Sequence, residues 1–115
     1  MKKFEYTPPE QPRELILKLG QKITDRIGHT VTAEDPEYYG LEALVTDEMA
    51  EVALKMKVRK PMTLAQIVKA TGKEEKALEE LLQEMSNIGL LEYNWENPKH
   101  EKQYVLPMYV PGSAE

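Results

Sequence analysis

Cysteine is absent from this chain of 115 residues. Without a thiol, the chain forms no disulfide and supplies no thiolate to a zinc ion or an iron–sulfur cluster. Aromatic residues are few, with one tryptophan and one phenylalanine. No apolar stretch approaches the roughly 18 residues that cross a bilayer, and residues 1–15 lack the apolar core of a secretory signal. We therefore expect a cytoplasmic protein with no membrane contact.

Sequence motifs of common enzymes are missing as well. There is no phosphate-binding or dinucleotide-binding glycine loop and no G-x-S-x-G motif. The two histidines, His29 and His100, are predicted in different connecting segments, and we interpret them as surface residues rather than a metal or acid/base pair. The carboxylates of Glu74-Glu75 and Glu79-Glu80 fit the solvated face of a helix. We expect no catalytic, metal or cofactor-binding residue in this chain.

The composition that remains is that of one soluble globular domain, with 41% apolar and 30% charged residues. Its most informative stretch is residues 61–107. Thr63-Leu64-Ala65-Gln66 has the pattern of a capping box, which begins a helix. Gly72 ends that helix, because glycine allows the left-handed backbone of a tight turn. A second helix is predicted from about Glu74 to Asn87, and Gly89 ends it.

A hairpin follows the second helix. Residues 90–95 and 102–106 are predicted strands, joined by a turn at Asn97-Pro98-Lys99. The order helix, turn, helix, hairpin is typical of a winged helix-turn-helix unit. The apolar side of its second helix comprises Ala77, Leu78, Leu81, Leu82, Met85 and Ile88. Because Glu74 replaces the usual Ser or Asp, we expect a weak N-cap on this helix.

Residues 1–11 are predicted to be an extended arm. A helix follows from Pro12 to Ile27, ended by Gly28. Its apolar face comprises Leu15, Ile16, Leu19, Ile23 and Ile27. Gly20 lies inside this helix, where glycine costs about 1 kcal/mol against alanine, and so indicates a close contact or a kink.

Two shorter helices are predicted next. Asp35-Pro36-Glu37 is a helix-start pattern, and the helix is expected to run to about Leu44 and to bury Tyr39, Leu41 and Leu44. The connector before it contains Thr30-Val31-Thr32, a candidate extended segment. Thr46 is predicted to cap a third helix, with acids in its first turn and lysines in its last. Its apolar stripe comprises Met49, Val52, Ala53 and Met56.

DNA binding is the usual role of a winged helix, and the charges argue against it here. The second helix of the unit, Lys73–Met85, has two lysines against five glutamates, a net charge of −3. A helix that reads the major groove needs donors for bases and phosphates on its exposed face. The candidate DNA contacts are therefore limited to other segments: Lys55, Lys57, Arg59 and Lys60 before the unit, and Lys99 and Lys102 in the hairpin.

Protein contact is the other interpretation. Tyr93 and Trp95 share one strand face, because side chains alternate along a strand. Tyr104 lies on the returning strand. Aromatic side chains on a projecting hairpin either cover the core or anchor a partner. We expect at least one of the three to cover the core, keep Trp95 as the anchor candidate, and consider four other residues as possible members of the same patch: Tyr38, Tyr39, Met108 and Tyr109.

The segment YNWENPKHEKQYVLPMYVPGSAE, residues 93–115, resembles the N-terminal region of large iron–sulfur flavoprotein oxidoreductases of anaerobic bacteria, of the pyridine-nucleotide-disulfide type. In these proteins a small winged-helix-like region precedes the cluster- and flavin-binding parts. The resemblance implies an accessory domain that docks within its own enzyme or onto a partner subunit. It implies an iron–sulfur cluster and FAD in the parent protein, but none of the redox residues maps onto this chain.

The sequence thus predicts a mainly helical winged helix-turn-helix domain over residues 12–106, with extra N-terminal helices and a small β wing. Residues 107–115 contain two prolines and are expected to link it to a following domain. The favoured function is a non-catalytic interaction module of a larger oxidoreductase, with its own parent domains or another protein as partner. The alternative is a DNA-binding regulator that uses Lys55–Lys60 and the wing.

Overall fold

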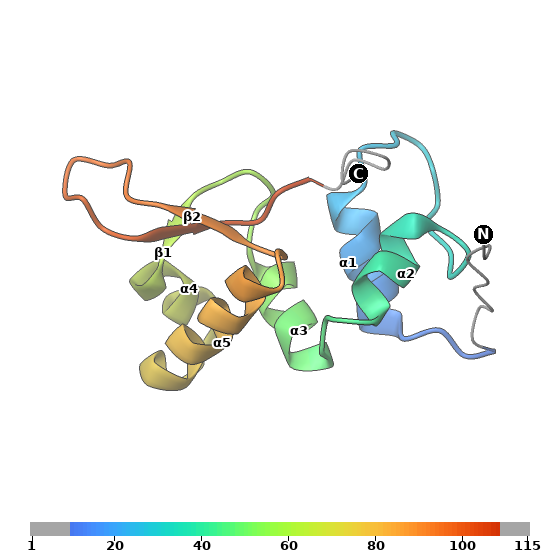
Figure 1. The fold of residues 1–115 in the computed structure, drawn as a ribbon, viewed down its shortest axis with the longest axis horizontal. Helices are drawn as coiled ribbons and strands as arrows, with labels where there is room; N and C mark the ends of the chain where they lie inside the picture. The colour runs from blue at the N-terminus through green and yellow to red at the C-terminus, as the bar shows by residue number, and fades with distance from the viewer. Residues whose placement is uncertain (1–9, 109–115) are drawn as a thin grey trace, which may run out of the picture.

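The computed structural model describes residues 10–108, which form a mainly helical domain with a small antiparallel sheet near the C-terminus (Figure 1). The described helices are α1 (Glu14–Ile23), α2 (Pro36–Glu42), α3 (Asp47–Lys55), α4 (Leu64–Thr71) and α5 (Glu75–Asn87). The strands are β1 (Met62–Thr63), β2 (Glu92–Asn94) and β3 (Gln103–Val105). This order is compatible with a winged-helix-like arrangement.

Helix α3 connects two parts of the molecule. Figure 1 shows α1 and α2 side by side on one side of α3, and α4, α5 and the sheet on the other. One apolar core runs through both parts. Its fully buried members include Ile16, Leu19, Tyr38, Val52, Met56, Ile67, Leu78, Leu82, Met85 and Leu106. Among the described helices, none has the length and apolar character needed to cross a bilayer.

The helix-turn-helix unit forms as predicted because its caps are local. Thr63 Oγ1 accepts the Gln66 backbone N–H at 3.3 Å, and Gln66 Oε1 accepts the Thr63 backbone N–H at 2.9 Å, which completes the capping box. Gly72 has φ of 72° between α4 and α5, and Gly89 has φ of 84° after α5. The Thr46 hydroxyl caps α3 by accepting the Met49 N–H at 3.2 Å.

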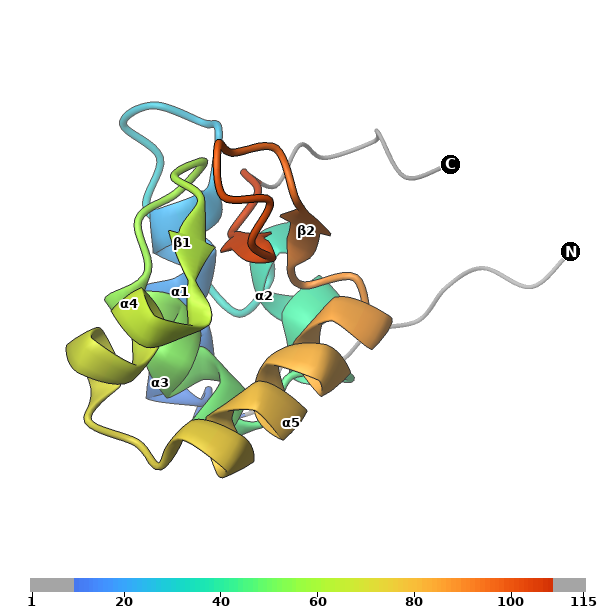
Figure 2. The same cartoon turned by 90° about the vertical axis from the view of Figure 1, so that its left-hand side faces the viewer.

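The sheet has three strands in the order β1-β3-β2, all antiparallel. The hairpin β2–β3 was predicted, but β1 was not, because a strand of two residues shows no alternating pattern. Figure 2 shows β1 above α4 and β2 above the last turns of α5. The sheet therefore lies over one side of the α4–α5 pair.

The predicted helix 12–27 is shorter in the structure. Helix α1 begins at Glu14 and ends at Ile23, and Thr24 already has an extended backbone. The Thr24 hydroxyl and the Arg26 guanidinium both donate to the carboxylate of Glu37, so the chain leaves the helix axis to reach α2. Ile27 is consequently fully exposed rather than part of the apolar face.

Helix α2 also differs from the prediction. It ends at Glu42, and its buried residues are Glu37 and Tyr38. Tyr39 and Leu41 are only half-buried, and Leu44 is 58% exposed. The segment at residues 30–32 forms no strand in the described part of the chain.

The N-cap of α5 is stronger than predicted. The Glu74 carboxylate accepts the Ala77 backbone N–H at 2.6 Å, so a glutamate side chain performs the role of the usual Ser or Asp. Ala77 itself is exposed, whereas Leu78, Leu81, Leu82 and Met85 are buried as expected.

Gly20 makes the close contact that its position inside α1 indicated. A Cβ atom at this position would lie 2.9 Å from the backbone oxygen of Glu37 and 3.3 Å from Val31 Cγ1. We expect Gly20→Ala to lower the free energy of unfolding by about 2 kcal/mol, because overpacking outweighs the gain in helix propensity. Urea unfolding followed by far-UV circular dichroism measures this change. Lys18→Ala, at an exposed position of α1, is the control and should stay within about 0.5 kcal/mol.

Candidate functional site

The hairpin carries a compact group of rings around one ammonium, here termed the hairpin cluster: Tyr93, Trp95, Lys102 and Tyr104. The rings of Tyr93 and Trp95 meet edge to face, with centroids 5.5 Å apart and an angle of 88° between the planes. Lys102 Nζ lies 4.3 Å from the ring centroid of Tyr93, 5.2 Å from that of Tyr104 and 5.8 Å from that of Trp95. Cation–π attraction of this kind fixes the hairpin side chains relative to one another.

The three rings differ in how far they are buried. Tyr104 is 3% exposed, whereas Tyr93 is 46% exposed and Trp95 is 44% exposed. Tyr93 and Tyr104 are directly opposite in the β2–β3 register, so they share one sheet face. Burial raises the pKa of the Tyr104 hydroxyl, and the nearby charge of Glu79 raises it further. Tyr104 thus covers the core, and Tyr93 and Trp95 remain accessible.

The hairpin cluster lies beside the exposed side of α5. Lys102 Nζ donates to Gln83 Oε1 at 3.3 Å and so connects the hairpin to this helix. The exposed glutamates of α5 are Glu75, Glu79, Glu80 and Glu84. None of these four takes part in an ion pair within residues 10–108. An aromatic hairpin and an acidic helix surface therefore adjoin, with a neutral amide and one lysine between them.

The other predicted aromatic residues do not join this patch. Tyr38 is fully buried on α2, where its hydroxyl accepts the Arg13 backbone N–H at 3.0 Å. Tyr39 is also on α2. Met108 lines a different cavity, and Tyr109 lies outside the described residues.

The predicted DNA contacts occupy two separate places. Lys55, Lys57, Arg59 and Lys60 are exposed at the end of α3 and in the loop that leads to β1. A parallel bridge from Val58 to Leu106 and a hydrogen bond of 2.8 Å from Arg59 N to Leu106 O hold this loop. Lys102 instead points to the rings of the hairpin and to α5. Lys102 leads into the central strand β3, whereas Lys55–Lys60 precede the edge strand β1.

The two histidines have unrelated surroundings. His29 Nε2 lies 2.9 Å from Asp35 Oδ2 in the loop between α1 and α2. His100 is exposed in the hairpin loop with φ of 56°. Over residues 10–108, no group of three or more His, Asp or Glu side chains is placed to hold a metal ion.

A buried ion network between α1 and α2 escaped the sequence analysis. Glu37 is fully buried. Its Oε2 accepts the Thr24 hydroxyl at 2.6 Å and Arg26 Nε at 2.8 Å, and its Oε1 accepts an Arg26 amino group at 2.5 Å. The same Arg26 amino group lies 3.1 Å from Asp35 Oδ1. This network ties the loop after α1 to the start of α2.

The network also sets the charge of its carboxylates. Burial alone would raise the pKa of Glu37, but the hydrogen bonds from Arg26 and Thr24 outweigh burial and lower it. The pKa of Asp35 is lowered in the same way, because the Thr32 N–H, His29 and Arg26 overcome its desolvation. The pKa of Arg26 is raised, chiefly by its hydrogen bonds to Glu37. Each group thus stays ionised at neutral pH.

A mainly apolar cavity of about 420 Å³ lies where α1 and α2 approach the end of α5. Its lining includes Leu41, Leu44, Ile88, Leu90 and Pro107. Glu92 is the titratable side chain of this lining, so the cavity offers shape and apolar contact rather than a reactive pair.

The described residues form a mainly helical domain with a small antiparallel sheet. No protein-family model matches the chain, and searches of curated proteins and of solved structures find no significant match. The residues of the hairpin and of α5 are therefore the basis for a functional hypothesis.

Proposed function

We propose that this chain is a non-catalytic winged-helix accessory domain that docks onto another protein surface through its hairpin. The observation that supports this is the pair of half-exposed rings, Tyr93 and Trp95, beside the acidic side of α5. Tyrosine and tryptophan dominate the energetics of protein interfaces, because each buries a large rigid surface and loses little side-chain entropy. Lys102 lies over both rings, and this contact reduces the cost of ordering them on binding.

Charge on α5 makes a DNA partner less favourable. In a winged-helix complex with DNA, this helix would enter the major groove. Its exposed glutamates would then approach phosphate oxygens, and the electrostatic term that dominates DNA affinity would be repulsive. The basic residues Lys55–Lys60 lie near the β1 edge rather than on α5. A protein surface with positive charge fits the α5 side better.

The partner that we propose is another part of the same parent protein, an iron–sulfur flavoprotein oxidoreductase. The resemblance of residues 93–115 to such enzymes supports this partner. A chain without cysteine supplies no cluster ligand, so the redox chemistry would belong to the following domains. Reading the parent gene beyond codon 115 tests this directly. We expect a cysteine-rich cluster motif or a dinucleotide-binding glycine motif there, and a stop codon would contradict the proposal.

Docking through the hairpin predicts a loss of affinity when its rings are removed. We expect the double variant Tyr93→Ala, Trp95→Ala to bind the remainder of the parent polypeptide about 30-fold more weakly, or about 2 kcal/mol, as for a truncated hot spot. Isothermal titration calorimetry with the two purified polypeptides measures the affinity. Glu96→Ala, at an exposed position of the same hairpin, is the matched control and should bind like the wild type.

A second measurement separates docking from a change in folding. Trp95 is the sole tryptophan, so labelling with 5-fluorotryptophan gives one fluorine resonance that reports on the hairpin. This resonance should shift when the remainder of the parent is added. Two results together would show that the hairpin is not the docking surface: unchanged affinity of the double variant, and a wild-type fluorine resonance that does not move when the remainder of the parent is added.

A further inference from the structure

A second hollow, of about 280 Å³, lies between the end of α3, the loop after it and helix α4. It is lined by Lys55, Lys57, Lys60, Met62, Gln66 and Ala70. The three lysines are exposed and come from the last residue of α3 and from the loop after it. The remaining polar lining residue is Gln66, whose Oε1 is occupied by the capping box while its amide NH₂ is left as a donor. The hollow thus offers several hydrogen-bond donors and no carboxylate.

The three lysines belong to a larger group of basic side chains without an ion pair in the described residues, which also includes Lys69, Lys76 and Lys99. They differ from the others in lining one hollow together. The protein has a net charge of −5, and Arg13, Lys18, Arg26 and Lys73 each pair with a carboxylate. Within the described residues, no ion pair involves the lysines of the hollow. Glu51 is one helical turn before Lys55, yet no ion pair joins the two. Three ammonium groups around one hollow repel one another, and an anion between them would relieve that repulsion.

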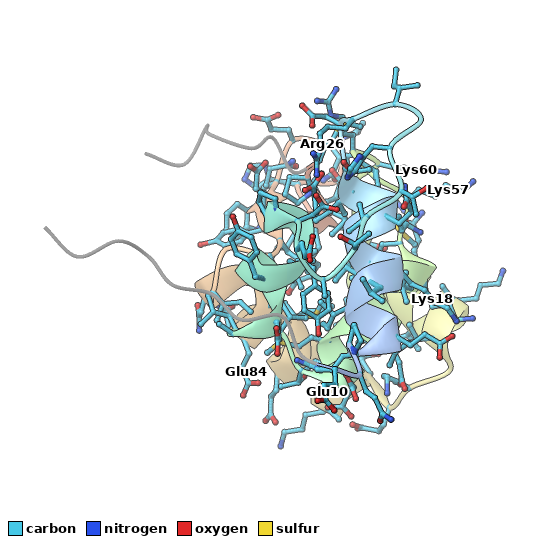
Figure 3. All side chains as sticks on the ribbon, turned by 90° about the vertical axis from the view of Figure 1, so that its right-hand side faces the viewer. Glu10, Lys18, Arg26, Lys57, Lys60 and Glu84 are labelled. Carbon is cyan, nitrogen blue, oxygen red and sulfur yellow. The ribbon has the colours of Figure 1, made fainter. Side chains whose placement is uncertain are left out.

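The backbone beneath the hollow is fixed by hydrogen bonds. Lys60 N donates to Lys57 O at 3.2 Å, and Arg59 N donates to Leu106 O at 2.8 Å. Arg59, between them, has φ of 63°, a left-handed conformation that is costly for arginine and is held by these bonds. The turn brings Lys57 and Lys60 to the same side, and Figure 3 shows both projecting from one side of the molecule, away from Glu10 and Glu84. The backbone that carries these two lysines is therefore held within the domain itself.

Lys22 counters the negative end of helix α3 at the same place. Lys22 of α1 donates to the Leu54 carbonyl at 2.9 Å, at the last turn of α3 and next to Lys55. Its ammonium offsets the negative end of the α3 dipole. An anion that enters the hollow therefore meets little repulsion from the helix terminus.

We propose that this hollow, termed the lysine pocket, binds a small ligand that carries two adjacent phosphate groups. Three ammonium groups line the hollow, and a diphosphate offers them more oxygens and more negative charge than a single phosphate does. Met62 and Ala70 add apolar surface to the lining, which suits the uncharged part of such a ligand. The lysines surround a hollow and do not form the long stripe that follows a nucleic-acid backbone. This site is separate from the hairpin and does not rest on the docking proposal.

Inorganic pyrophosphate is the probe for the test. At low ionic strength, where charges are weakly screened, calorimetric titration of the 115-residue chain should show saturable binding at one site. We expect the double variant Lys57→Gln, Lys60→Gln to weaken the affinity at least tenfold. The matched control is Lys76→Gln, Lys99→Gln, which removes the same charge from exposed positions outside the pocket and should leave the affinity within twofold. Thermal unfolding confirms that both variants remain folded.

Two results would overturn the proposal. The first is absence of saturable binding, or equal weakening in the pocket variant and the control, which would show only a general charge effect. The second concerns the source of the phosphate groups. Duplex DNA that displaces pyrophosphate, binds more tightly and loses affinity more steeply with salt would assign the pocket to a nucleic-acid backbone instead. The docking proposal is tested by the Trp95 fluorine resonance, and the lysine pocket is tested by pyrophosphate binding. Either proposal can therefore fail without the other.

Discussion

Tyr38→Ala is expected to lower the free energy of unfolding by about 4 kcal/mol, because it removes a fully buried aromatic ring from the contact between α2 and α1. The ring belongs to the core that joins both parts of the molecule. Its hydroxyl also accepts the Arg13 backbone N–H at 3.0 Å, just before α1 begins. The truncation therefore opens a cavity and releases the start of the first helix together.

Urea unfolding followed by far-UV circular dichroism gives the change for Tyr38→Ala. Tyr38→Phe separates the two contributions, since it keeps the ring and removes only the hydroxyl. We expect this variant to lose about 1 kcal/mol, the net value of one hydrogen bond. Equal losses for the two variants would show that the hydrogen bond, rather than ring burial, stabilises this contact.

The C-terminal part of the domain was predictable because its signals are local. Thr46, Thr63 and Gln66 are within three residues of the backbone groups that they cap. Gly72 and Gly89 have the positive φ that their positions required. The apolar spacing of α5 corresponds to its buried side. These caps and turns depend on neighbours in the sequence and could be predicted from it. The two-residue strand β1 and the Glu74 cap of α5, in the same part of the chain, could not.

The N-terminal part was less predictable because a distant pairing decides it. Ile27 continues the helical spacing of α1, yet it is fully exposed. The reason is Glu37, which takes hydrogen bonds from Thr24 and Arg26, 13 and 11 residues earlier in the chain. No local pattern indicates that a glutamate in the first turn of a short helix is fully buried. The sequence pattern identified Glu37 only as part of a helix start.

The candidate sites likewise combine local features that the sequence predicts with distant contacts that it does not. Strand alternation placed Tyr93 and Trp95 on one face, but it could not show that Tyr104 would be the ring that is buried. That depends on the sheet packing over α5. The lysines at positions 55–60 were visible as a cluster along the chain. Their arrangement around a hollow was not, because Gln66 and Ala70 of α4 complete it only after folding.

Glu37→Gln is expected to lower the free energy of unfolding at neutral pH by about 3 kcal/mol. The two oxygens of Glu37 accept hydrogen bonds from Thr24 and Arg26 in a fully buried position. Glutamine keeps the shape but has one oxygen, so its NH₂ group must face one of these donors. Hydrogen bonds to a charged acceptor contribute about 1.5 to 3 kcal/mol, and a buried donor left without an acceptor adds to the loss.

The pH dependence of this difference identifies the carboxylate as its cause. The pKa of Glu37 is lowered in the folded protein from its ordinary value of 4.5. Its contribution is therefore fully present above the unfolded-state pKa and is lost as the pH falls through the folded-state pKa. The stability of the wild type should exceed that of Glu37→Gln at pH 7 and should converge on it in acid. Asp35 remains in both proteins, so its own acid dependence largely cancels in the comparison.

Urea titrations of both proteins across the acid range provide the measurement. Glu34→Gln is the matched control, because Glu34 is an exposed glutamate in the same loop and should change stability by less than about 0.5 kcal/mol at any pH. A difference between wild type and Glu37→Gln that is the same in acid as at pH 7 would mean that packing, and not the charge of Glu37, holds α1 to α2. The convergence in acid would instead show that one buried ion network shapes the part of the chain that the sequence patterns failed to predict.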